Sequence, residues 1–165
     1  MEIVLNATNI RRAVRGPILA LVLIGALAGT ALATTASGFT ATPLSHGTLA
    51  HSTRVHADGI KLRTHGSVDF VTSQVAIAPL GTSGWHTHPG VVLVTVSAGT
   101  VTFYNQHCKA TVYPAGSSFV ESGDDPGLAR NESATVPAAV YATYIVPVGT
   151  TVLRIDTPNP GCSQN

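Results

Sequence analysis

The sequence predicts an all-β domain, and three observations support that prediction. Val, Thr and other residues that favour strands form short runs along the chain. The 16 Gly and 10 Pro among 165 residues place turn-forming sequence between these runs. Beyond the N-terminal region, no segment combines helical spacing of apolar residues with capping residues at its ends. About ten short strands at regular spacing are typical of a barrel or a sandwich.

The first 33 residues have the pattern of a secretory signal peptide. Three arginines between positions 11 and 15 precede an apolar run at 18–28, and Ala31-Leu32-Ala33 forms a small-x-small cleavage site. We therefore predict a signal peptide over 1–33 and a location in the cell envelope or outside the cell. An uncleaved membrane anchor is the alternative, because the apolar stretch is nearly long enough to span a bilayer. Membrane contact is expected through this segment alone.

The rest of the chain divides into a linker and one barrel domain. Residues 34–50 are rich in Thr, Ser, Ala and Gly without periodicity, so we predict a linker there and a β-barrel domain over 51–165. A hairpin is expected first, because Asp58-Gly59 separates alternating runs at 54–57 and 60–63. Further strands are expected at 68–78, 86–88, 91–96, 100–104, 110–113, 118–121, 128–131, 138–146 and 152–155.

The pair His86 and His88 is the main candidate for a functional site. Residues i and i+2 of a strand point to the same face, so both imidazoles project together, while Trp85 and Thr87 point to the other face. Two neutral imidazoles on one face are the beginning of a site for zinc, copper, iron, manganese or nickel. The alternative is a pair of barrel histidines that bind no metal and hydrogen-bond to their surroundings.

Composition and cysteine content restrict the remaining possibilities. Nine Lys and Arg against eight Asp and Glu give a formal net charge of +1, which offers no electrostatic footprint for nucleic acid. Cys108 and Cys162 are the only two cysteines, and an even pair in an exported chain predicts a disulfide. Two free thiols are the alternative. Closing a loop of this length would stabilise the fold by about 4 kcal/mol.

The residues around the histidine pair resemble those of the cupin superfamily. The first cupin motif matches Gly81, His86, His88 and Gly99, and the second matches 114–116 and Asn131. With the block at 85–90 and the terminal 159–162, the likeness covers roughly residues 47–162 and is to small secreted bacterial single-domain cupins of unassigned function. The resemblance implies a cupin-type jelly-roll barrel. In a typical metal-binding cupin, three His and one Glu hold the ion inside the barrel.

Two of these four ligand positions are changed in this chain. Val92 stands at the Glu position and Gly127 at the third His position. Groups that could complete a site are Gln74, Asp124, Asp125 and Glu121. We favour Glu121 because it follows the second motif on the strand that this motif feeds, and because an amide such as that of Gln74 is a poor ligand for a transition metal.

The resemblance leaves three functions open. The first is an exported cupin that binds a metal ion, a small molecule or both in its barrel through His86 and His88. The second is a metal-dependent dioxygenase or isomerase that uses two His and a carboxylate. The third is a structural or partner-binding β-barrel without catalysis. A homodimer through an edge strand is compatible with a barrel of this type.

Overall fold

The computed structural model describes residues 33–164, which form twelve strands and no helix. Within these residues no helix exists that could cross a bilayer. The predicted signal peptide lies outside the described residues apart from Ala33. The strands are β1 (Ser37–Leu49), β2 (Arg54–Ala57), β3 (Ile60–Arg63), β4 (Val68–Thr82), β5 (His86–Thr87), β6 (Val91–Ala98), β7 (Thr100–Asn105), β8 (Ala110–Pro114), β9 (Ser118–Ser122), β10 (Gly127–Arg130), β11 (Ala138–Pro147) and β12 (Ile155–Asp156).

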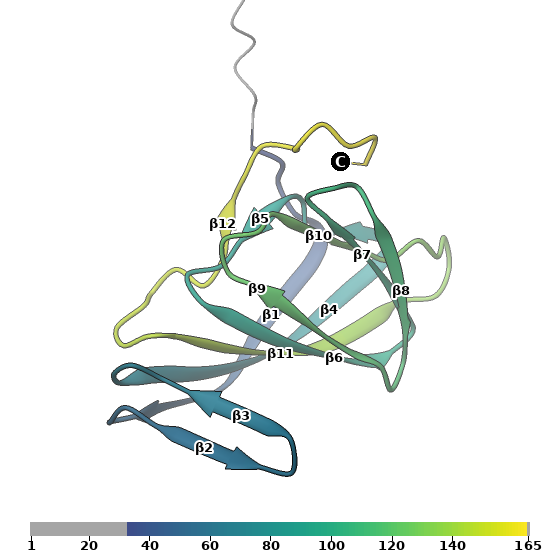
Figure 1. The fold of residues 1–165 in the computed structure, drawn as a ribbon. Helices are drawn as coiled ribbons and strands as arrows, with labels where there is room; N and C mark the ends of the chain where they lie inside the picture. The colour runs from purple at the N-terminus through teal and green to yellow at the C-terminus, as the bar shows by residue number, and fades with distance from the viewer. Residues whose placement is uncertain (1–32, 165) are drawn as a thin grey trace, which may run out of the picture.

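Ten of the strands form one sheet that curls into a nearly closed barrel (Figure 1). The order is β12-β5-β10-β4-β11-β6-β9, with β1 added to β4 and with β7 pairing both β10 and β8. Burial alternates along β6 and β11, as expected for strands with one face toward a core. The inward residues are mainly valines, among them Val92, Val94, Val96, Val140 and Val146. The all-β prediction is confirmed.

The predicted linker at 34–50 is wrong over most of its length. Residues 37–49 form β1, which runs antiparallel to β4 from the pair Ser37 and Thr82 to the pair Leu49 and Val68. Thr48 Oγ1 donates a hydrogen bond of 2.6 Å to Oδ1 of Asp69. The other carboxylate oxygen of Asp69, Oδ2, lies 3.2 Å from His46 Nε2. The side chains of β1 are almost all exposed, so this strand shows no alternation of apolar and polar residues. The barrel domain therefore begins before residue 51.

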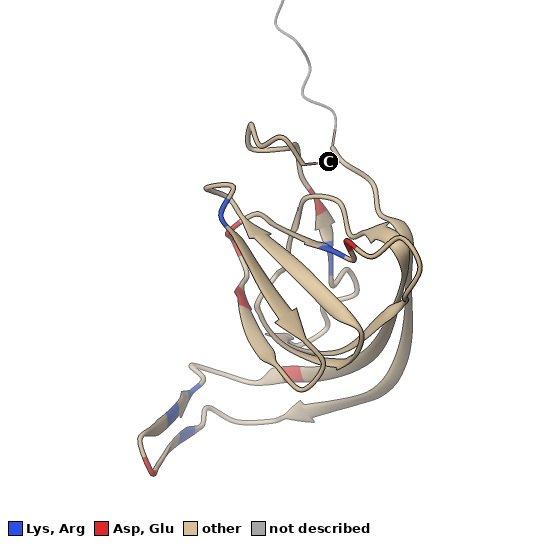
Figure 2. Ribbon diagram, turned by 90° about the vertical axis from the view of Figure 1, so that its right-hand side faces the viewer, with Lys and Arg blue, Asp and Glu red and all other residues tan. Residues whose placement is uncertain are grey.

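The hairpin of β2 and β3 has the predicted bounds and forms a separate two-stranded sheet. Asp58 and Gly59 both have positive φ, 47° and 83°, as the tight turn of a two-residue hairpin requires. The hairpin projects from the end of the barrel opposite to the C-terminal tail (Figures 1 and 2). The last strand is shorter than predicted, because residues 152–154 carry no strand pairing.

A disulfide joins Cys108 to Cys162, so the predicted pairing is confirmed. It fixes the C-terminal tail to the loop that connects β7 and β8. Trp85, fully buried, donates from Nε1 to the backbone carbonyl of Gln164 at 3.0 Å. The disulfide and this hydrogen bond together hold the tail against Trp85, in the segment between β4 and β5. Trp85 therefore has a packing role.

Candidate metal centre

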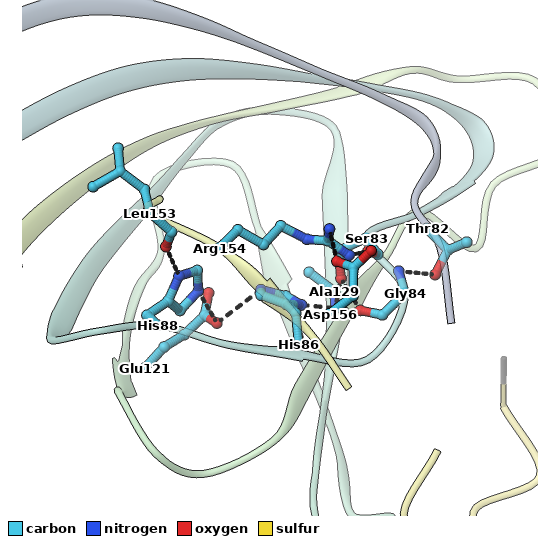
Figure 3. Close-up of polar contacts among 10 residues, drawn as sticks. All are labelled: Thr82, Ser83, Gly84, His86, His88, Glu121, Ala129, Leu153, Arg154 and Asp156. Carbon is cyan, nitrogen blue, oxygen red and sulfur yellow. Dashed lines mark hydrogen bonds and ion pairs between the residues drawn. The ribbon is translucent and has the colours of Figure 1, made fainter. Parts of the chain in front are cut away.

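His86 and His88 enter the barrel from β5 and the residue after it, as the i, i+2 spacing predicted. The two residues are 4% and 5% exposed, and their rings meet edge to face with centroids 4.7 Å apart. His86 Nδ1 lies 2.9 Å from the carbonyl oxygen of Gly84, and His88 Nδ1 lies 2.6 Å from that of Leu153 (Figure 3). A carbonyl oxygen only accepts hydrogen bonds, so both Nδ1 atoms carry hydrogen. In its neutral form, each ring therefore presents the lone pair of Nε2 to the interior.

Glu121 completes a cluster of three possible ligands. Its Oε2 lies 3.2 Å from His88 Nε2 and 3.5 Å from His86 Nε2. Together these are the one group of at least three His, Cys, Asp or Glu side chains among residues 33–164 whose ligand atoms lie within 4.8 Å of one another. Glu121 belongs to β9 and pairs directly with Val92 of β6. Since both side chains face the interior, the carboxylate enters the barrel one strand away from the expected position.

Two of the three separations within the cluster, those from Glu121 to each histidine, fit a metal ion. Nitrogen and oxygen ligands lie about 2.0–2.2 Å from zinc, and ligand atoms on a tetrahedron of that size are roughly 3.3 Å apart. The two measured Nε2 to Oε2 distances, 3.2 and 3.5 Å, lie on either side of that value. The backbone carbonyls of Gly84 and Leu153 accept hydrogen bonds from the Nδ1 atoms, and such bonds commonly fix the orientation of histidine ligands.

The charge of Glu121 must be balanced by protons or a metal ion between its carboxylate and the two imidazoles. Burial alone raises the pKa of this carboxyl, but hydrogen bonds from His86 and His88 and their positive charge outweigh burial and lower the pKa to about 2. Glu121 is therefore a carboxylate at neutral pH. If both imidazoles are neutral, three acceptor atoms face one another without a hydrogen between them. Protons on Nε2 or a metal ion must provide the positive charge.

Two side chains that the sequence did not single out for this site line it as well. Tyr144 of β11 packs edge to face against His88 with centroids 5.5 Å apart. Burial and the negative charge of Glu121 raise the pKa of Tyr144 to about 12, and Arg154 opposes that rise. The guanidinium of Arg154 pairs with Asp156 and donates to the backbone carbonyl of Ser83 (Figure 3). Tyr144 remains a hydrogen-bond donor at neutral pH, and Arg154 is a fixed cation beside the histidines.

Glu121 borders two cavities. The inner cavity has a volume of about 80 Å³ and is mostly apolar, with His86, Tyr144 and Arg154 among its lining residues. The outer cavity has a volume of about 460 Å³ and opens between β9 and the β7–β8 loop, where Phe103 and Tyr113 line it. A molecule in the outer cavity would therefore contact Glu121.

The other candidate ligands lie away from the histidines. Gln74 is exposed on the outer face of β4, and Asp124 is exposed in the β9–β10 loop. Asp125 accepts hydrogen bonds from Gln106 and Ser122 at the rim of the outer cavity. Among the proposed completing groups, only Glu121 reaches the histidines.

Gly127, at the third His position, pairs with His86 in the sheet. A Cβ atom on Gly127 would lie 2.5 Å from Cζ of Phe103. The phenyl ring therefore occupies the space that a third histidine would need.

Asn131, the Asn of the second motif, is buried and donates through its amide to the backbone carbonyls of Ala78 and Val136, so its role is to hold the chain in place.

The sequence matches no protein-family model and no curated protein. Solved structures that resemble the chain include the Cupin_2 domain of an XRE-family transcriptional regulator from Enterobacter cloacae (17% identity, 67% of this chain and 97% of that one, TM-score 0.45). Another is a conserved protein with a double-stranded β-helix domain from Klebsiella pneumoniae (17%, 53% and 76%, TM-score 0.46). A third is oxalate oxidase (24%, 48% and 46%, TM-score 0.41), of which the match spans less than half the length.

The chain's own topology places the two motifs as the resemblance implied. The His-x-His segment forms β5 at the wall of the barrel, and residues 114–116 form the turn from β8 into β9, which carries Glu121. The fold is that of a single-domain cupin. In this chain, the two histidines of the first motif lie at the wall of the barrel, the carboxylate comes from the neighbouring strand, and Gly127 stands at the third His position beside the ring of Phe103.

Proposed function

We propose that this cupin binds a divalent transition metal ion through His86, His88 and Glu121. The observation that supports the proposal is the convergence of Nε2, Nε2 and Oε2 while both Nδ1 atoms donate to backbone carbonyls. Neutral imidazoles in these tautomers are in the state that metal binding requires. Two His and one carboxylate suit Fe(II), Mn(II), Ni(II), Cu(II) or Zn(II), and three protein ligands leave coordination positions open.

A second candidate function is metal-dependent catalysis on a small molecule, as in a dioxygenase or an isomerase. The outer cavity favours it, because a substrate there would contact Glu121 directly. A bound metal would supply Lewis acidity or an activated oxygen ligand. Tyr144 would donate a hydrogen bond near His88, and Arg154 would favour a negative charge in the inner cavity. The binding function requires only the three ligands, so it is the primary proposal.

We also propose that the protein works outside the cytoplasm. The Cys108–Cys162 disulfide is consistent with an oxidising compartment. The pattern of residues 1–33 indicates export, with a cleaved signal peptide or a retained membrane anchor as the two possible forms. Metal analysis should therefore use protein exported to the bacterial periplasm, where the disulfide forms and the metal supply differs from that of the cytoplasm.

The test is metal content followed by titration calorimetry with each of the five metals. We expect near-stoichiometric metal, and His88→Ala should lower affinity by more than about 100-fold, since loss of an outer partner alone costs 10–100-fold. His51→Ala is the matched control, because His51 is exposed in the segment before β2. If no metal binds at micromolar concentration, or if His51→Ala and His88→Ala behave alike, the proposal is wrong.

A further inference from the structure

The β2–β3 hairpin has two chemically opposite faces. In its register, Arg54 pairs with Arg63 and His56 pairs with Lys61, so these four side chains share one face. The alternate pairs place the apolar residues Val55, Ala57, Ile60 and Leu62 on the other face. One face of this small sheet is therefore basic and the other is apolar.

The basic face has no negative partner in the described part of the chain. No ion pair there involves Arg54, Lys61 or Arg63. The single acid of the hairpin, Asp58, lies in the turn. Like charges directly opposite each other in a sheet are destabilising. Three of the six Lys and Arg residues at positions 33–164 are thus gathered on ten residues, without internal neutralisation (Figure 2).

The apolar face is also without a covering layer. Ile60 is 73% exposed and Val55 is 51% exposed, although both belong to regular strands. β2 and β3 pair only with each other, and Figures 1 and 2 show the hairpin standing apart from the barrel. An isolated two-stranded hairpin is marginally stable in water unless its apolar face packs against something. A partner surface that stabilises the hairpin must therefore offer apolar groups to one face and negative charge to the other.

We propose that this hairpin docks on the surface of an anionic lipid bilayer. The apolar face would enter the boundary between head groups and acyl chains, and the long Arg and Lys side chains would extend back to the phosphates. A soluble polyanion could neutralise the cations but would leave Val55 and Ile60 in water. The lipid surface satisfies both faces. The hairpin and the C-terminal tail lie at opposite ends of the barrel, so docking leaves the end near β5 and β12 free (Figure 1).

The test is sedimentation with vesicles of equal parts phosphatidylglycerol and phosphatidylcholine, and with vesicles of phosphatidylcholine alone. The protein should begin at Thr34, because the apolar run before it would bind lipid by itself, and all described strands and the disulfide follow that residue. We expect binding to the anionic vesicles that weakens as salt rises from 0.05 to 0.5 M, since added salt shortens the range of the attraction.

Two sets of variants separate the contributions of the faces. Lys61→Gln should lower the partition coefficient about fivefold, while Lys109→Gln, with the same charge change in an exposed loop of the barrel, should not change it. Ile60→Thr should lower it several-fold, while Val112→Thr, also at an exposed strand position, should not. Thr keeps the strand preference of the residue it replaces. Circular dichroism and metal binding should be unchanged in all four variants.

Three results would overturn the proposal. One is equal binding to charged and uncharged vesicles. Another is equal loss of binding in Lys61→Gln and Lys109→Gln, which would mean that net charge alone matters. The third is binding to dextran sulfate as tight as to anionic vesicles and unaffected by Ile60→Thr. That result would show that the hairpin recognises a soluble polyanion through its basic face only.

Discussion

Replacing Glu121 by glutamine removes the negative charge of the site with almost no change in shape. Without metal, burial raises the pKa of this carboxyl, but the two imidazoles outweigh burial and lower the pKa from 4.5 to about 2. One pKa unit corresponds to about 1.4 kcal/mol, so the ionised form gains roughly 3 kcal/mol over the neutral form. The side chains of Glu121 and both histidines are largely buried, so little of this gain is lost to solvent screening. We expect Glu121→Gln to lower the free energy of unfolding by about 3 kcal/mol at pH 7.

The pH dependence gives this prediction a second, independent readout. The pKa is lower in the folded state than in the unfolded state, so the stabilisation is fully present above pH 4.5. It is lost as the pH falls toward about 2, and the parent and Glu121→Gln should converge there. The assay is urea unfolding in EDTA at several pH values, followed by far-ultraviolet circular dichroism. Glu132→Gln is the control, because Glu132 is an exposed partner of Arg130 and Tyr104.

The reasoning would be refuted by a Glu121→Gln protein that is as stable as the parent at pH 7 without metal. In that case the amide hydrogens would satisfy neutral imidazoles, and no positive charge would be held between the side chains. A stability difference that stays constant from pH 7 to pH 2 would also contradict it. Either result would show that the metal-free site holds no proton on Nε2 between the histidines and Glu121.

Three further predictions concern the metal ligands, the disulfide and the packing around Gly127. Glu121→Val should abolish metal binding, and adding Val92→Glu to it should restore affinity to within about tenfold of the parent by calorimetry, because these residues face each other across two strands. Reduction of the disulfide should cost about 4 kcal/mol in urea unfolding and shift Trp85 fluorescence to longer wavelength as the tail loosens. Gly127→Ala should lower the free energy of unfolding by about 1–3 kcal/mol, since the ring of Phe103 must move, and Phe103→Leu should relieve the loss.

Much of the barrel could be predicted from the sequence because alternation and turn chemistry act locally. The run at 91–96 and the Asp58-Gly59 turn both appear where the pattern placed them. β1 could not be found in this way. Its residues are small and polar, and it is held by backbone pairing to β4 and by Thr48 on Asp69. Such a strand depends on partners 19 to 45 residues later in the chain, which no local pattern reveals.

The ligands were more predictable than their surroundings. The i, i+2 spacing places His86 and His88 on one face in any strand, and the order of the motifs singled out Glu121. The hydrogen bond from His88 to the carbonyl of Leu153 depends on the return of the chain after β11. In the sequence, Tyr144 is one more inward residue of β11, two positions after Ala142. Its contact with His88 becomes visible only in the folded barrel. Contacts between distant strands therefore decide the tautomers and the electrostatics of the site.

The position of the carboxylate shows how a motif can change while a site survives. Residues that pair across antiparallel strands have Cβ atoms about 5 Å apart, which is within the reach of a glutamate side chain. A carboxylate lost at Val92 can thus be supplied by Glu121 on the paired strand and still meet the same two histidines. No such exchange is available for the third histidine, because Phe103 fills the space beside Gly127. The site therefore keeps two imidazoles and one carboxylate, and two cavities border it at Glu121.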